Sequence, residues 1–186
     1  MVATATAEAR QLLTARDLDD VPDDGNRYEV IDGELYVSPF PDEAHQRATK
    51  KLFAALHAHV KAHALGRVYP AGLKVVLDEP TGVGPDIVFV SNTRLDGLHA
   101  DGFHGAPELV VEVVSSKPQL DRRIKLQKYA RSGIPHYWIV DPKLRSLVAY
   151  KLDGDRYRAV AEHGARERFE PELFPGLVLA LGDLWE

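Results

Sequence analysis

The spacing of apolar residues predicts a β-hairpin near the start of the chain. Two short runs of β-favouring residues, 28–31 and 34–37, flank the pair Asp32-Gly33. An Asp-Gly pair between two such runs is a strong hairpin signal, because both residues tolerate a positive φ. Upstream, Thr14 and Asp17 have the spacing of a helix N-cap, which predicts a helical turn over residues 15–20.

Two later segments have the period of amphipathic helices. In residues 42–65 apolar side chains recur every three or four positions, and Gly66 follows as the predicted stop. Residues 119–132 show a similar period with a basic polar face, and Gly133 follows them. Each helix therefore has one apolar face that can pack on a sheet.

Predicted β-strands fill most of the remaining sequence. They cover residues 68–77, 85–90, 108–115, 136–141, 146–151 and 156–161, with a polar loop through residue 106 and short β pieces in the tail. The order of these elements predicts an α/β fold with one central mixed β-sheet flanked by helices. We expect a single domain over residues 14–186, preceded by a flexible segment at residues 1–13.

Composition excludes several classes of protein. The 186 residues include no cysteine, which excludes disulfide scaffolds, zinc fingers, iron–sulfur clusters and cysteine nucleophiles. No apolar run approaches the roughly 18 residues of a membrane span, so we expect a cytoplasmic protein with no membrane partner. The chain has no P-loop, nucleophile elbow or dinucleotide fingerprint, and we expect no organic cofactor.

Two carboxylates lie in predicted strands whose apolar neighbours indicate burial away from water. Every residue of the run 85–90 after Asp86 is apolar, and apolar residues also surround Glu112 in the run 108–115. Strands that are apolar on both faces are typical of the centre of a covered sheet. An ionised carboxylate at such a position is costly unless it is paired or binds a cation. A carboxylate at a strand end that reaches solvent stays an open alternative, more so for Asp86 than for Glu112.

Together these acids suggest a site for a hard divalent cation. Mg²⁺ and Mn²⁺ prefer carboxylate and carbonyl oxygens, and the backbone carbonyl of Val113 is a candidate third ligand. A lysine near Asp86 and Glu112 would complete a site for phosphodiester hydrolysis, because it can orient water or stabilise the transition state.

These residues belong to a longer pattern that resembles the PD-(D/E)xK nuclease superfamily. Pro85-Asp86 and the run 108–115 carry the resemblance, and residues 121–142 look like the Uma branch of restriction endonucleases. Residues 27–37 and His45 also match that branch, so the resemblance covers about residues 14–152. It implies a restriction-endonuclease-like core and a metal-dependent endonuclease.

The chain departs from the superfamily at one position. The superfamily carries its lysine two residues after the second acid, where this chain has Val114. The resemblance implies that Lys125, on the following helix, has taken this role. Lys125 lies one turn before Tyr129, so its amine can reach back toward the strands. Alternatively, Val114 marks a reduced site, and the chain is a DNA-binding module on the nuclease fold.

Three further residues are candidates for the same site. Glu29 and Glu34 flank the predicted hairpin, and either can supply a carboxylate, although Glu29 can equally face solvent. His45 shares a helical face with Leu52 and Leu56, which predicts that it points inward. It is either a hydrogen-bonded core residue or, as the resemblance implies, a contact for substrate phosphate.

Charge is distributed unevenly around a net value of −5. Residues 1–44 hold 11 acidic and 3 basic side chains, whereas residues 117–131 hold six basic side chains and one acidic one. The basic segment is either a solvated helix face or a patch for DNA phosphates. As a patch it would bind substrate through Lys117, Arg122, Arg123 and Lys128.

The main hypothesis is a DNA endonuclease that uses Mg²⁺ or Mn²⁺. Asp86 and Glu112, with Glu29 and the Val113 carbonyl, would bind the metal, and Lys125 would support the attacking water or the transition state. A hydrolase of another phosphate ester is a more distant alternative. The resemblance also implies a homodimer, because restriction-type nucleases often cut both strands as dimers.

Overall fold

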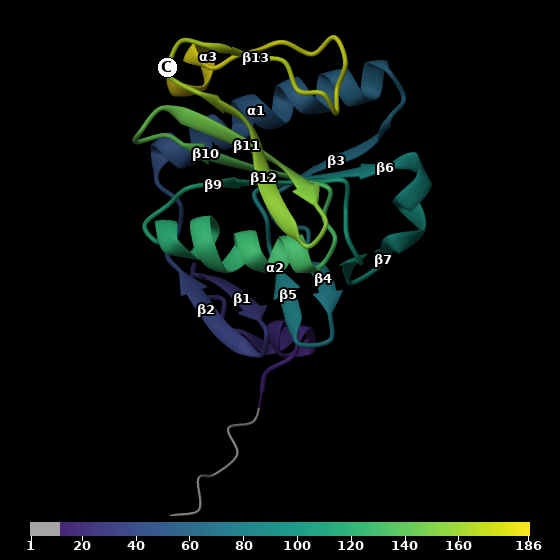
Figure 1. The fold of residues 1–186 in the computed structure, drawn as a ribbon. Helices are drawn as coiled ribbons and strands as arrows, with labels where there is room; N and C mark the ends of the chain where they lie inside the picture. The colour runs from purple at the N-terminus through teal and green to yellow at the C-terminus, as the bar shows by residue number, and fades with distance from the viewer. Residues whose placement is uncertain (1–11) are drawn as a thin grey trace, which may run out of the picture.

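The computed structural model describes residues 12–186, and two six-stranded sheets dominate it (Figure 1). The flexible segment predicted at residues 1–13 therefore lies outside the described residues, apart from Leu12 and Leu13. Leu13 N donates a hydrogen bond to Gly33 O at 3.1 Å, so this end of the described chain is attached to the hairpin turn.

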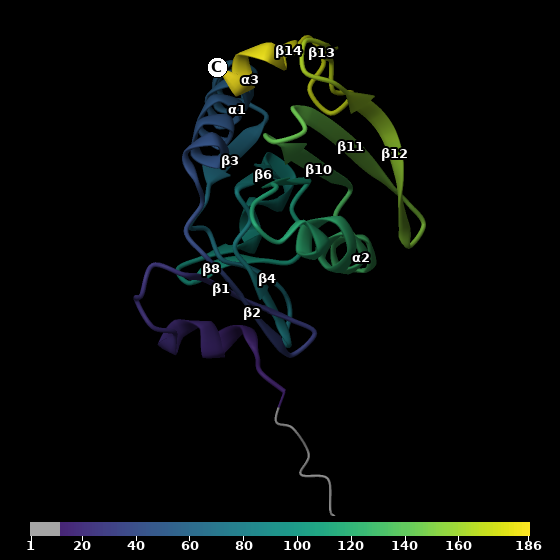
Figure 2. The same cartoon turned by 90° about the vertical axis from the view of Figure 1, so that its left-hand side faces the viewer.

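The central sheet is mixed, as predicted. Only β9 and β10 pair in parallel, and its other neighbours are antiparallel. Its order is β12 (Arg156–His163), β11 (Ser146–Asp153), β10 (His136–Asp141), β9 (Leu109–Val113), β6 (Ile87–Ser91) and β3 (Gly66–Pro70). Figures 1 and 2 show α1 on one side of this sheet and α2 on the other.

The two faces of β9 explain its unbroken apolar run. Val111 and Val113 pack in the cluster formed with α1, whereas Val110 and Val114 pack in the cluster formed with α2 and the second sheet. All four are buried, since they are at most 6% exposed. Glu112 points to the same side as Val110 and Val114, because side chains alternate along a strand.

The expectation of a single sheet is wrong, because the hairpin begins a second one. The order of this second sheet is β2 (Glu34–Ser38), β1 (Arg27–Ile31), β5 (Thr81–Val83), β4 (Val75–Asp78), β8 (Gly102–His104) and β7 (Leu98–His99). The hairpin is confirmed, with Asp32 and Gly33 at φ of 50° and 81°. β13 (Arg168–Phe169) and β14 (Leu179–Ala180) form a separate pair in the tail.

One predicted strand is in fact two. The run 68–77 divides between β3 and β4, which belong to different sheets. The chain turns at Ala71-Gly72, where Gly72 has a φ of 109°. Both halves of the run are apolar, so periodicity alone does not reveal the break.

The long helix α1 (Glu43–Ala62) is confirmed, but its end is not set by Gly66. Asp42 caps its start by accepting a hydrogen bond from His45 N at 2.9 Å. Past its end the left-handed residue is Ala64, with a φ of 50°. Gly66 instead begins β3, where a Cβ would lie 2.2 Å from Val90 O, so glycine is required for the close approach of the backbones.

The second predicted helix begins with a wider turn than expected. Leu120–Lys125 is π-helical and continues directly into α2 (Leu126–Arg131). The shorter helical elements are η1 (Ala15–Asp20), η2 (Asn92–Gly97) and α3 (Gly182–Trp185). No helix of residues 12–186 is long and apolar enough to cross a membrane.

Candidate active site

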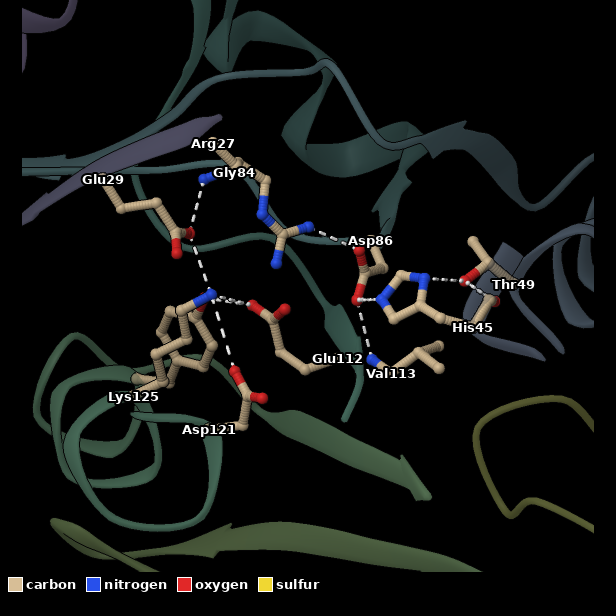
Figure 3. Close-up of polar contacts among 11 residues, drawn as sticks. Arg27, Glu29, His45, Thr49, Gly84, Asp86, Glu112, Val113, Asp121 and Lys125 are labelled. Carbon is tan, nitrogen blue, oxygen red and sulfur yellow. Dashed lines mark hydrogen bonds and ion pairs between the residues drawn. The ribbon is translucent and has the colours of Figure 1, made fainter. Parts of the chain in front are cut away.

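Asp86 immediately precedes β6 and is completely buried. Its Oδ1 accepts a hydrogen bond from Arg27 Nη1 at 2.6 Å. Its Oδ2 lies 3.1 Å from His45 Nε2 and accepts a 2.7 Å bond from the backbone N–H of Val113 (Figure 3). Asp86 therefore joins three elements, α1, β1 and β9, at one end of the central sheet.

Glu112 and Lys125 form the second part of the site. Glu112 lies within β9, Lys125 ends the π-helical segment, and both side chains are 0% exposed. Lys125 Nζ donates to Glu112 Oε1 at 3.0 Å, so the amine does reach back from the helix to the strand. The π-helical turn is notable here, because such turns occur frequently at functional sites.

Glu29 comes from the hairpin and is only 1% exposed, which excludes the solvent-facing interpretation. Its Oε1 lies 2.8 Å from Lys125 Nζ and accepts a 2.9 Å bond from Gly84 N. Glu34, the other hairpin candidate, is exposed and accepts a hydrogen bond from the Tyr36 hydroxyl. The second sheet therefore contributes Glu29, and not Glu34, to the buried cluster.

Two cluster members had no role in the sequence analysis. Asp121 Oδ1 lies 3.7 Å from Lys125 Nζ, one helical turn away, and Tyr129 donates its hydroxyl to Glu112 Oε1 at 2.7 Å. Their spacing of four residues on either side of Lys125 is the signal that could have identified them. Arg27 lies in the segment 27–37, which matches the Uma branch. Its contact with Asp86 is visible only in the folded structure, because the two residues are far apart in the sequence.

The electrostatic environment differs sharply between the two central acids. Burial acts to raise the pKa of Asp86, but the hydrogen bond with His45 and the charge of Arg27 outweigh it and lower that pKa to about 2. At Glu112 burial dominates and raises the pKa to about 8, against the opposing effect of Lys125. Asp86 is therefore ionised at neutral pH, whereas burial favours the protonated form of Glu112.

The lysine is held in its charged form. Burial disfavours the ammonium, but Glu112 and Glu29 outweigh burial and raise the pKa of Lys125 above its ordinary value. Burial also raises the pKa of Asp121, to about 6. Four carboxyl groups thus surround two cationic side chains, Lys125 and Arg27.

The residues present fit a divalent cation. Glu29 Oε2 and Glu112 Oε2 are buried and have no hydrogen-bond partner. Buried carboxylate oxygens normally have partners, and two unpaired ones in a single cluster are of the type that a divalent cation prefers as ligands. Within residues 12–186, no group of three or more acidic or histidine side chains is arranged as metal ligands. Arg27 and Lys125 lie among the carboxylates and form ion pairs with them.

His45 is inward, as its helical position predicts, and it is 3% exposed. Its Nε2 contacts Asp86, and its Nδ1 lies 3.4 Å from Thr49 Oγ1, one helical turn farther on. The contact makes His45 a neighbour of the site and holds the Asp86 carboxylate in place. A contact with substrate phosphate stays a prediction.

The basic segment is only partly exposed, and several of its side chains are paired within the protein. Lys128 is buried between Asp32 and Asp78, at 2.5 and 2.6 Å, and Arg122 pairs with Asp141 at 2.8 Å. Lys117 donates to the backbone oxygen of Val37 at 2.5 Å, whereas Arg123 is exposed. These side chains mostly hold the helix to its surroundings, and their binding of substrate stays a prediction.

The same fold occurs in a solved nuclease-like structure. The crystal structure of "a putative nuclease belonging to DUF820 from Anabaena variabilis" aligns with a TM-score of 0.74 over 93% of this chain and 97% of that one, at 19% identity. The model of the Uma2 family, described as "Putative restriction endonuclease", matches residues 15–182. The chain therefore belongs to the Uma2 family. No curated protein sequence matches it significantly.

Proposed function

We propose that the chain is a metal-dependent endonuclease that hydrolyses phosphodiester bonds of DNA. The observation that carries the proposal is the buried cluster in which Lys125 Nζ contacts Glu112 and Glu29 while each glutamate keeps one unpaired oxygen. A lysine among buried acids on a nuclease fold is suited to phosphodiester chemistry. Membership of the Uma2 family supports the same activity.

Asp86 and Glu112 would hold Mg²⁺, or Mn²⁺, with Glu29 and the Val113 carbonyl as further oxygen donors. When bound, such an ion lowers the pKa of water and neutralises charge on the phosphate. Arg27 and His45 fix the Asp86 carboxylate from two sides, at 2.6 and 3.1 Å. Tyr129 fixes Glu112 through its hydroxyl. The carboxylates are therefore oriented before substrate arrives.

Lys125 acts through its charge in this proposal. Its ammonium group donates to Glu112 Oε1 and forms an ion pair with Glu29 Oε1, and because it is protonated it has no lone pair with which to take a proton from water. A fixed cation in a water-excluding site stabilises the negative charge that develops on the phosphate in the transition state. A protonated lysine can therefore orient the attacking water as a donor or stabilise the transition state, and it does not act as a base.

The observation that favoured a DNA-binding module was Val114 in the usual position of the lysine. Val114 is buried among apolar side chains beside the site, while Lys125 supplies a cation to the same glutamate. The position of Lys125 therefore favours the nuclease over a reduced site.

The test is incubation of supercoiled plasmid with the purified chain in Mg²⁺, in Mn²⁺ and in EDTA. We expect metal-dependent nicking that falls by about 100-fold or more in Asp86→Asn and in Lys125→Met, the usual loss when a charge-stabilising group is removed. Matched controls exist for both variants. Asp101 forms an exposed pair with His104, and Lys151 forms an exposed pair with Glu172.

Asp101→Asn and Lys151→Met should cleave at the wild-type rate. Nicking by Asp86→Asn at the rate of the control would contradict the site. Salt-sensitive DNA binding without any metal-dependent nicking would instead support the binding module.

A further inference from the structure

The buried acids limit how a nucleic acid can reach them. Glu29, Asp86 and Glu112 are at most 1% exposed, and Lys125 is 0% exposed. A hollow of about 350 Å³ leads to Asp86, and Arg27 and His45 also line it. A second hollow of about 210 Å³ adjoins it, since Arg27 and Gly72 line both. Arg27 thus lies between two spaces beside the site.

Phe40 lies on the wall of the larger hollow and is 72% exposed. It is the aromatic member of the large exposed hydrophobic side chains in residues 12–186. Single exposed apolar residues are common, but this one shares a hollow with Asp86. An exposed aromatic ring beside a nuclease site is suited to stacking on a nucleobase.

The charge near the larger hollow argues against close contact with a duplex. Asp23 lines this hollow, and the preceding element ends in Asp19 and Asp20. Lys74, on the smaller hollow, is neutralised by Asp19 at 2.7 Å. Double-stranded DNA carries about one negative charge per 1.7 Å of helix axis, against about 3.4 Å for each strand, so an acid at the opening repels a duplex more strongly than a single strand.

We propose that the site acts on unpaired strands, including those that open transiently in a supercoiled plasmid, and that the base next to the cleaved phosphate enters the larger hollow and stacks on Phe40. This inference rests on the proposed nuclease function and names its substrate class. An unpaired strand can bend its phosphate toward Arg27 and leave one nucleotide in each hollow. The backbone of an intact duplex is held at the rim of a helix and has no such freedom.

The experiment measures binding and stacking separately from cleavage. The probe is a single-stranded oligodeoxynucleotide with 2-aminopurine, a base whose fluorescence is quenched by stacking, and the comparison is its duplex. Ca²⁺ replaces Mg²⁺ so that binding is measured without turnover. We expect the wild type to bind the single strand at least about tenfold more tightly than the duplex, with quenching.

Phe40→Trp should keep both the affinity and the quenching, whereas Phe40→Leu should lose the quenching and about tenfold in affinity, within the range found for base stacking on aromatic side chains. Val160→Ala, which changes an exposed residue on β12 at the far edge of the central sheet, should behave like the wild type. Equal affinity for the single strand and the duplex, or unchanged quenching in Phe40→Leu, would overturn the proposal.

Cleavage of both substrates in Mg²⁺ is then measured on the same preparations. Equal cutting of the duplex and the single strand would overturn the inference while leaving the nuclease function intact. Absence of cleavage together with Phe40-dependent quenching would contradict the nuclease function and leave the stacking site.

Discussion

At the scale of single residues, Glu112 shows how the same burial that defines the site also destabilises its charged form. Its side chain is 0% exposed, and one of its oxygens has no partner. Ionisation at this position is opposed by burial and by the neighbouring acids, and favoured by Lys125. A cation that binds Glu112 would remove this conflict, because it would favour the ionised carboxylate.

The stability of the metal-free protein should therefore fall as pH rises. The pKa of Glu112 is raised from 4.5 to about 8 on folding, so the folded state binds more protons than the unfolded state between these values. The free energy of unfolding then decreases with pH, by at most about 1.4 kcal/mol per pH unit from this residue. Urea unfolding in EDTA at pH 7 to 8 measures the slope.

Glu112→Gln isolates the contribution of this carboxyl group. Glutamine keeps the shape and carries no titratable proton, so the decrease between pH 7 and 8 should be smaller in this variant than in the wild type. Glu172→Gln, at an exposed glutamate paired with Lys151, serves as the control and should keep the wild-type slope. Identical slopes for Glu112→Gln and the wild type would show that Glu112 does not carry the raised pKa.

At the scale of elements, the helical segment 120–131 connects the two sheets. Lys125 faces the buried acids, and Lys128, nearly one turn later, binds Asp32 in the hairpin turn and Asp78 at the end of β4. Both lysines belong to one segment, so the pairs of Lys128 also set the position of Lys125. A basic helix face was visible in the sequence, but its partners come from positions far away in the chain.

Replacing Lys128 should affect folding more than DNA binding. Lys128→Met removes pairs with two half-exposed acids, and we expect the free energy of unfolding to fall by about 1 kcal/mol. The dependence of DNA affinity on salt should stay unchanged, because the ammonium group of Lys128 is already paired with Asp32 and Asp78. Arg123→Gln, at an exposed position, is the comparison, and it should reduce the salt slope by about one if Arg123 contacts phosphate.

A reduced salt slope in Lys128→Met, with an unchanged free energy of unfolding, would show that Lys128 contacts DNA phosphate and does not mainly stabilise the fold. The measurement is the DNA dissociation constant over a series of NaCl concentrations, beside urea unfolding of each variant.

At the scale of the whole molecule, the sequence predicted most helices and strands, but it did not predict how the strands divide between two sheets. The mixed central sheet, the hairpin and both long helical segments follow from periodicity and turn residues. The second sheet does not follow from these signals. Its strand β4 continues the apolar run of β3, and its strand β5 contains only Thr81–Val83. Short strands of this kind carry too few residues for a period to be visible.

Residues of the candidate site were predictable where a charged side chain lies in an otherwise apolar strand. Asp86 and Glu112 stood out because acids are costly in dry strands, and Lys125 followed from the resemblance. Arg27 did not stand out, because an arginine at the start of a strand is ordinary in sequence, and Tyr129 was marked only by its spacing of four residues from Lys125. Glu29 was ambiguous until the second sheet placed it against Lys125 at 2.8 Å. The homodimer stays a prediction.

We propose that this buried cluster binds a metal ion and cuts DNA with it. The most direct measurement is the rate of plasmid nicking as a function of Mn²⁺ concentration, with Mn²⁺ binding measured calorimetrically on the same preparations. We predict that the wild type and Glu172→Gln bind Mn²⁺ and nick DNA over the same concentration range, and that Glu112→Gln loses both. Nicking by Glu112→Gln at the wild-type rate and Mn²⁺ dependence would contradict the account.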